Sequence, residues 1–154
     1  MKMGDRKSTG ELDKVLGKLN PERLSDYLKE QKSNMFTEET GFSSYMKEIF
    51  RKNGYTQQEV FLRADIPERY GYKLISQEKH TVQRDVIIRL TLASTFTLAE
   101  TNRALKLYGF SQLYSRIERD AVLIVAINNK IRDLDEVNDL LMKNGFDKLY
   151  SFNI

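Results

Sequence analysis

The sequence contains an internal repeat, and this repeat restricts the possible folds more than any other feature. Residues 97–115 align with residues 133–151 at an offset of 36, and nine of the nineteen aligned positions are identical. With a one-residue shift the match continues upstream, where an Arg-Asp pair at 84–85 corresponds to one at 119–120. Self-similarity at this period is typical of stacked structural repeats. The identical pairs are Leu98/Leu134, Glu100/Glu136, Asn102/Asn138, Leu105/Leu141, Gly109/Gly145, Phe110/Phe146, Leu113/Leu149, Tyr114/Tyr150 and Ser115/Ser151.

Each repeat unit is predicted to be a helical hairpin that ends in the motif Gly-Phe-x-x-Leu-Tyr-Ser. Gly109 and Gly145 are expected in the left-handed conformation that ends a helix. Phe110 and Phe146 then fold back on the helix that they follow, and the tyrosine of the motif anchors the exit of the unit. A single hairpin cannot bury both of its faces, so we interpret the duplication as structural. A partner-binding or dimerising surface is the alternative.

Apolar residues recur with helical spacing along nearly all of the sequence, and only two prolines interrupt it. No segment of useful length alternates with period two, so we expect no β-sheet and an all-α fold class. The helices predicted from this spacing in the larger, C-terminal part of the chain cover residues 43–53, 57–64, 68–76, 83–94, 98–108, 116–129 and 134–144.

The sequence predicts three regions. Residues 1–42 form an N-terminal helical extension and linker, with helices at 11–19 and 21–31 and with the first ten residues disordered. Residues 43–115 form a central domain, and residues 116–154 form a C-terminal helical hairpin packed on it.

The composition excludes several classes of protein. The chain has no cysteine, which removes disulfide scaffolds, cysteine-based zinc sites and thiol nucleophiles and fits a reducing compartment. The first ten residues carry charge with no apolar run behind them, so no signal peptide is predicted. The most apolar stretch, residues 121–127, is far shorter than the ~20 residues of a membrane helix. We therefore expect a soluble, cytoplasmic protein without a membrane partner.

The net charge of +3 is concentrated in one segment of the chain. Residues 43–96 have nine Lys/Arg against six Asp/Glu, whereas residues 1–42 and 97–154 each have eight of either sign. A basic bias on one module is what attraction to phosphate requires. Ordinary scatter of three charges is the alternative.

Residues 56–77 have the spacing of two short helices joined by a tight turn. Their apolar side chains are expected to pack together and hold the two helices at a steep angle across that turn. These apolar residues are Val60, Ala64, Ile66 and Leu74.

At this point the sequence resembles the phage-repressor (Xre/Cro) family of helix-turn-helix DNA-binding domains. The matching stretch runs from Gly54 to Ser76, and its opening, Gly-x-Thr-Gln-x-Glu, is the most specific part. The resemblance covers Ser43 to about Glu100. It implies that residues 43–115 are a DNA-binding-like domain, a repressor-like head of five helices that the C-terminal helical hairpin repeat continues.

Three departures from the family pattern place the sequence in a divergent branch. The family usually has a small residue where Phe61 stands and a bulky aliphatic residue where Gly71 stands. These positions face each other across the turn, so their exchange roughly conserves core volume. Some members carry an ion pair at the positions of Phe50 and Ile75, where apolar residues are a neutral or stabilising replacement. Asp65 stands at the turn position where the family commonly has glycine. Aspartate is compatible with this position because it tolerates a left-handed backbone better than most residues.

The resemblance also implies which residues contact DNA. Gln57 is expected at a phosphate, where the start of the first motif helix adds its dipole. Arg69 is suited to bind guanine through two hydrogen bonds, and Glu68 to accept one from cytosine. Tyr72 is placed either on the reading face or inward beside Gly71. The residues expected at base edges are Glu68, Arg69, Tyr70, Tyr72 and Lys73, and those expected near the backbone after the recognition helix are Lys79, His80 and Arg84.

Other chemistry has little support in the sequence. His80 is the only histidine, so we expect no metal site, no cofactor and no catalytic residue. No glycine-rich phosphate loop occurs. The paired carboxylates at residues 38–39 and 133–136 are interpreted as solvated charge and helix-dipole partners. The chain is therefore not expected to be an enzyme.

The sequence thus predicts a sequence-specific, duplex-DNA-binding transcriptional regulator that acts as a homodimer. The dimer surface is either the C-terminal repeat or residues 11–31. The alternative is an adaptor with the helix-turn-helix fold, which docks to a protein partner through the aromatic recognition face or the tandem repeat and does not bind DNA.

Overall fold

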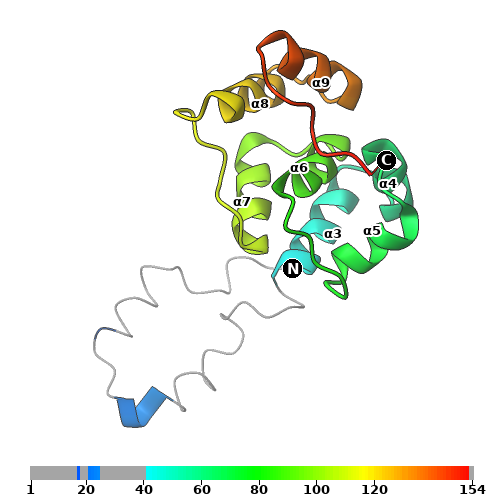
Figure 1. The fold of residues 1–154 in the computed structure, drawn as a ribbon. Coiled ribbons are helices and arrows are strands. Elements are labelled where there is room, and N and C mark those ends of the chain that lie inside the picture. Colours follow the sequence, from blue (N-terminus) through cyan, green and yellow to red (C-terminus); the bar gives the residue numbers. More distant parts are fainter. Residues whose placement is uncertain (1–16, 18–20, 25–40, 153–154) are drawn as a thin grey trace.

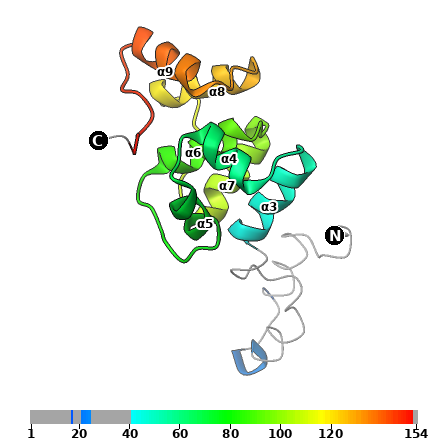
Figure 2. The same ribbon diagram turned by 90° about the vertical axis from the view of Figure 1, so that its right-hand side faces the viewer.

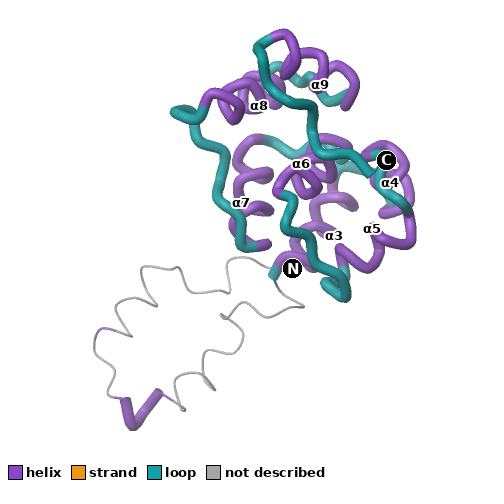
Figure 3. The backbone as a smooth tube through the Cα atoms, viewed as in Figure 1, coloured by secondary structure: helices purple, strands orange, loops and turns teal. Residues whose placement is uncertain are grey.

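The computed structural model describes residue 17, residues 21–24 and residues 41–152, and Figures 1 and 3 show that this part of the chain is helical without a strand. The all-α class is confirmed for these residues. Each helix predicted after residue 42 is present, and its ends lie within two residues of the predicted ones. The helices are α3 (Phe42–Lys52), α4 (Gln57–Ala64), α5 (Glu68–Ile75), α6 (Arg84–Ala93), α7 (Leu98–Tyr108), α8 (Glu118–Asn128) and α9 (Leu134–Lys143).

The predictions for the N-terminal region fall almost entirely outside the described residues. These are the helices at 11–19 and 21–31, the linker that follows them and the disorder of the first ten residues. Within the described part, Pro21 begins a short 3-10 helix, η2 (Pro21–Arg23), at the place where the sequence predicts a helix start.

Helix α6 is the centre of the fold. Every residue from Val86 to Ala93 is buried, because this stretch is apolar on nearly all sides and only a surrounded helix accommodates such a sequence. Helices α4, α7 and α9 pack against α6, and α3 packs against α4, α5 and α7. In Figures 1 and 2, α8 and α9 form a separate layer at one end of the other helices.

Left-handed glycines end the second helix of each repeat unit, as the sequence predicts. Gly109 has φ 102° and Gly145 has φ 83°. The N–H groups of Phe110 and Phe146 donate to carbonyls five residues back, at 2.8 and 2.9 Å. Both phenylalanine rings are half-buried against the core, so the closing motif turns the chain back onto the helix it leaves.

Phe61 and Gly71 lie against each other between α4 and α5, as the sequence predicts. Phe61 is fully buried, and a Cβ atom built on Gly71 would lie 2.6 Å from two atoms of the Phe61 ring. Only glycine fits this position while the ring stays in place. Phe50 and Ile75 are also buried.

We expect Gly71→Ala to lower the free energy of unfolding, although alanine is preferred over glycine in a helix by about 1 kcal/mol. The overlap with the ring costs about 1–3 kcal/mol. Phe61→Leu removes the ring, so Gly71→Ala on that background is expected to cost at least about 1 kcal/mol less. Urea unfolding of the four chains, followed by circular dichroism, measures the coupling. Simple additivity of the two substitutions would contradict close packing at this point.

The two repeat units make equivalent internal hydrogen bonds. In the first unit, α6–α7, Asn102 Oδ1 accepts from the N–H of Leu113 at 2.8 Å. In the second unit, α8–α9, Asn138 Oδ1 accepts from the N–H of Leu149 at 2.9 Å. The identical asparagines of the repeat therefore hold the closing segment of each unit.

Two Arg–Asp ion pairs join the units reciprocally. Arg84 of the first unit binds both carboxylate oxygens of Asp120 in the second, at 2.8 and 3.0 Å. Arg119 of the second unit binds both oxygens of Asp85 in the first, at 2.9 Å each. Each arginine also donates to closing-segment carbonyls of its own unit. Such reciprocity is the contact pattern of a two-fold relationship.

Each aspartate also accepts from a tyrosine N–H of the opposite unit. Tyr114 N–H donates to Asp120, and Tyr150 N–H donates to Asp85, both at 2.9 Å. The expectation that the tyrosines anchor the exit of each unit is thus met by their backbone groups, while the Tyr114 side chain is 60% exposed.

Asp120 is the most deeply buried member of these pairs, with 2% of its surface exposed. Burial by itself raises the pKa of Asp120, but hydrogen bonds from Arg84 and from the Tyr114 N–H outweigh burial and hold this pKa below its usual value. A carboxylate with a lowered pKa stabilises the fold above its unfolded-state pKa, and this contribution is lost as the pH falls through the folded-state pKa.

We expect Asp120→Asn to lower the free energy of unfolding by about 2–3 kcal/mol at neutral pH, since it removes a buried charged hydrogen-bond partner. The variant should also lose less stability than the parent below about pH 4. Lys52→Ala is the control, because it breaks the exposed Lys52–Glu100 ion pair, which contributes about 0.5 kcal/mol. Urea unfolding between neutral and acidic pH measures both effects. Equal losses in the two variants would contradict this role of Asp120.

Candidate nucleic-acid interface

Helix α4 begins at a capping box that its sequence specifies. Thr56 Oγ1 accepts from the N–H of Glu59 at 3.1 Å, and Glu59 Oε1 accepts from the N–H of Thr56 at 3.3 Å. This pairing satisfies donors that would otherwise remain open at the helix start. Gln57, the predicted phosphate contact, is the first residue of α4 and is half-buried.

A three-residue turn, residues 65–67, joins α4 to α5. Asp65 has φ 53° and ψ 48°, the left-handed conformation that the sequence predicts for this position. The apolar positions predicted to pin the two helices are all buried, and they are Val60, Ala64, Ile66 and Leu74. The outer face of α5 is therefore held in a fixed relation to the start of α4.

The outer face of α5 presents three charged side chains. Glu68 and Arg69 are exposed and Lys73 is half-buried. None of the three side chains makes a hydrogen bond or an ion pair within residues 41–152 and the other described positions. Their charges are thus not paired within the described part of the chain.

The two tyrosines of α5 are partly engaged inside the molecule. The Tyr72 ring lies edge-on to Phe61, with centroids 5.0 Å apart, and is 42% exposed. It therefore fills space beside Gly71 and also reaches the surface. The Tyr70 ring packs at 5.2 Å against Phe152 of the C-terminal segment. The sequence does not predict that contact, because it joins residues more than eighty positions apart.

Of the residues predicted near the DNA backbone, Lys79 and His80 are exposed in the segment between α5 and α6. The His80 ring lies 6.2 Å from that of Tyr108. Arg84 is different, because its Nε and both terminal nitrogens donate to Asp120 and to the carbonyls of Ser111 and Gln112. We therefore leave Arg84 out of the candidate interface.

A groove of about 430 Å³ lies between α3 and the start of α4, and two cations line it that the sequence analysis missed. Lys47 and Arg51 are exposed one helical turn apart on α3, and Thr56 and Gln57 line the opposite side. The i, i+4 spacing of Lys47 and Arg51 on an amphipathic helix can be read from the sequence alone. Their proximity to the start of α4 depends on how α3 and α4 pack, which only the structure shows.

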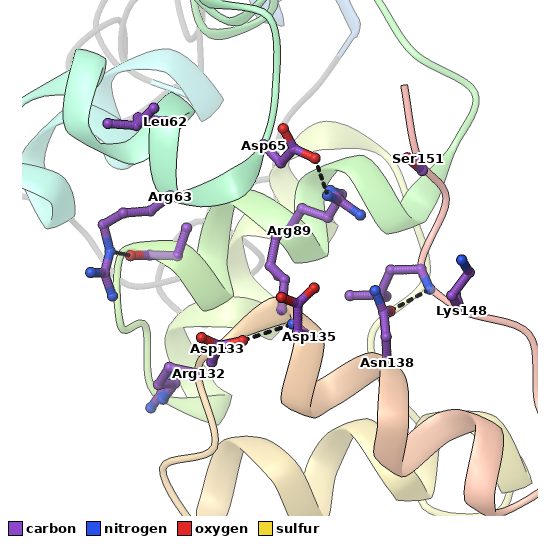
Figure 4. Close-up of a pocket in the computed structure, with 13 residues that line it drawn as sticks. Leu62, Arg63, Asp65, Arg89, Arg132, Asp133, Asp135, Asn138, Lys148 and Ser151 are labelled. Atoms are coloured by element: carbon purple, nitrogen blue, oxygen red, sulfur yellow. Dashed lines mark hydrogen bonds and ion pairs between the residues drawn. The ribbon is translucent and has the colours of Figure 1, made fainter. Parts of the chain in front are cut away.

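A second cleft, of about 540 Å³, separates α4 from α9, and Figure 4 shows its charged lining. Acidic and basic groups alternate there, so the cleft offers no field of one sign to a ligand. The charged residues that line it are Arg63, Asp65, Arg89, Arg132, Asp133, Asp135 and Lys148.

Arg89 lies in this cleft with 3% of its surface exposed. Its Nε donates to the carbonyl of Ala64 at 2.9 Å, and a terminal nitrogen donates to the carbonyl of Tyr150 at 3.0 Å. Burial lowers the pKa of Arg89, and the nearby carboxylate of Asp65 opposes this shift. Arg89 thus connects the end of α4 to the C-terminal segment. The sequence does not predict this role, because it shows only a single arginine within an apolar stretch.

Among the described residues, no group of three or more His, Cys, Asp or Glu side chains is arranged to hold a metal ion. None of the helices described has both the length and the apolar character needed to cross a membrane. No family model matches the sequence, and no curated protein or solved structure shows significant similarity to the chain. The residues and contacts above therefore carry the functional argument.

We expect Phe152→Ala to lower the free energy of unfolding by about 1 kcal/mol, since an aromatic pair contributes about 0.5–1.5 kcal/mol beyond its buried area. It should also change the chemical shifts of the Tyr70 ring in an NMR spectrum. Tyr114→Ala is the control, because this exposed ring has no aromatic contact within the described residues. An unchanged Tyr70 signal in Phe152→Ala would show that the C-terminal segment does not support α5.

Proposed function

We propose that this protein is a transcriptional regulator that binds duplex DNA sequence-specifically, with α5 as the recognition helix in the major groove. The supporting observation is the outer face of α5. A capped first helix, a left-handed turn and four buried apolar residues fix this face, and Glu68, Arg69 and Lys73 project from it without a hydrogen bond or ion pair to any described residue. Rigid placement of a few polar side chains is what direct readout of base edges requires.

The proposed roles follow from the chemistry of each side chain. Arg69 donates two hydrogen bonds to guanine, and Glu68 accepts one from the amino group of cytosine. Lys73, one turn further along α5, reaches a base edge or a phosphate. Tyr70 and Tyr72 border this face and supply apolar contact to thymine methyl groups.

Phosphate contacts are proposed on both sides of the recognition helix. On one side, Gln57 and the first N–H groups of α4, which the capping box does not use, meet a phosphate, and Lys47 and Arg51 add positive charge along the adjoining groove. On the other side, Lys79 and His80 lie in the exposed segment that follows α5. These contacts position the protein and carry no sequence information.

In this proposal α3 to α7 form the repressor-like head, and α8–α9 continue it as a second repeat unit. The protein acts in the cytoplasm as a homodimer on two half-sites, about 34 Å apart. It is not an enzyme and needs no cofactor.

An adaptor that binds a protein through the same face is the second candidate. The observation that favours it is the aromatic content of α5, since Tyr72 is 42% exposed and Tyr70 is covered in part by Phe152. Exposed tyrosines are enriched at protein interfaces. Co-purification of a stoichiometric protein partner without nucleic acid would favour this candidate, and the ultraviolet absorbance ratio of the purified protein distinguishes the two.

The DNA proposal predicts different effects for two cations. Arg69→Ala is expected to remove the preference for the selected site, at a cost of about 1–3 kcal/mol. Lys79→Ala should weaken binding to all sequences alike and reduce the salt dependence by about one phosphate contact. Lys143→Ala on α9 is the control, an exposed lysine outside the interface.

Gel-shift titrations against a pool of genomic fragments, at two salt concentrations, measure these effects. Specific binding that weakens steeply with salt is the expected result. Weak binding that is the same for the parent, Arg69→Ala and Lys143→Ala would contradict the proposal.

A further inference from the structure

We propose that the closing segment of the second repeat unit, residues 149–152, inhibits DNA binding by covering one side of α5. Its contact with α5 is the ring pair of Tyr70 and Phe152, which lie edge-on with centroids 5.2 Å apart. Figure 1 shows this segment in red, running from α9 past α6 toward α4 and α5. The inference rests on the proposed function, because it concerns the access of duplex DNA to the same helix.

Tyr70 lies beside the residues that are proposed to read bases. Gly71, Leu74 and Ile75 are the buried residues of α5 and form its inward side. Side chains three residues apart on a helix are neighbours, so Tyr70 is adjacent to Lys73 at the flank of the outer face. A ring that packs on Tyr70 therefore occupies the space next to the reading face.

The size of the major groove makes this arrangement incompatible with bound DNA. The groove is about 12 Å wide, and an α-helix with its side chains is about 10–12 Å across. A helix inserted in the groove leaves no room for a second segment of chain along its flank. Phe152 therefore has to leave Tyr70 before α5 can enter the groove and Tyr70 can contact a thymine methyl group.

The segment is firmly held up to Tyr150, two residues before Phe152. The N–H of Tyr150 donates to Asp85 at 2.9 Å, and its carbonyl accepts from Arg89 at 3.0 Å. Leu149 is buried in the core. These contacts keep Phe152 close to α5 even when its ring is displaced, so its local concentration at Tyr70 stays high. Phe152 thus competes with DNA from within the same molecule.

The repeat shows that the Phe152 ring is not needed to close a unit. Tyr114 of the first unit corresponds to Tyr150 of the second, but Arg116 stands where the second unit has Phe152. The first unit makes the equivalent backbone hydrogen bonds, although the Tyr114 ring has no aromatic contact within the described residues. Phe152 is therefore an addition to the closing motif, and what it adds is the contact with α5.

The test is the affinity of the full chain for a duplex obtained by selection from a random pool, measured by fluorescence anisotropy. Phe152→Ala is expected to bind about three- to tenfold more tightly than the parent, because it removes an aromatic contact that DNA binding has to break. A ring that only supported α5 would give the opposite sign. The salt dependence should stay the same, since no phosphate contact changes.

Tyr114→Ala is the matched control, because it removes the exposed ring at the equivalent place in the first unit. Its affinity is expected to stay within about twofold of the parent. Circular dichroism verifies that both variants are folded.

A double-mutant cycle shows whether Phe152 acts through Tyr70. On a Tyr70→Ala background, Phe152→Ala should change the affinity by less than about twofold, because its partner on α5 is already absent. In an NMR spectrum of the parent, addition of the duplex should move the ring signals of Phe152 toward their positions in Tyr70→Ala. An equal gain in affinity on both backgrounds would overturn the inference.

The outcomes separate this inference from the proposed function. A parent that binds the duplex, with a Phe152→Ala variant that binds equally well or more weakly, would overturn the inhibitory role and leave the DNA-binding proposal intact. If neither the parent nor Phe152→Ala binds any duplex, the DNA-binding proposal is overturned and the inhibitory role with it.

Discussion

The burial of α6 is the constraint on which the rest of the structure depends. A helix that is apolar on nearly all sides has to be surrounded, and α4, α7 and α9 pack against it. The one charge inside it, Arg89, is accommodated because two backbone carbonyls, those of Ala64 and Tyr150, accept its hydrogen bonds. A buried guanidinium without hydrogen-bond partners would destabilise the fold. Through these two hydrogen bonds, Arg89 instead joins the two-helix motif to the C-terminal segment.

The helices and their ends follow from local signals, which is why the sequence predicts them. Capping residues, left-handed glycines and apolar spacing act within a few residues, and the close approach of Phe61 and Gly71 joins positions only ten residues apart. The relation between the repeat units is not local. The Arg84–Asp120 and Arg119–Asp85 pairs connect residues more than thirty positions apart, and equal spacing of repeats does not determine how two units face each other.

The same distinction applies to the candidate interface. The turn geometry and the exposure of Glu68 and Arg69 agree with what the motif predicts. Arg84 is a basic residue after α5, where a contact to the DNA backbone is predicted, yet its guanidinium joins the repeat units. Lys47 and Arg51 were not predicted, because their proximity to the start of α4 depends on how α3 packs. Local chemistry specifies which residues can bind, whereas packing decides which of them remain free to do so.

An NMR titration of the full chain with a duplex obtained by selection from a random pool shows directly whether α5 binds DNA. Backbone amide signals are expected to change along α4 and α5, from Gln57 to Lys73, and in the segment around Lys79, while those of α9 stay constant. Signals that do not change on addition of duplex, or that change only outside α4 and α5, would contradict the proposal.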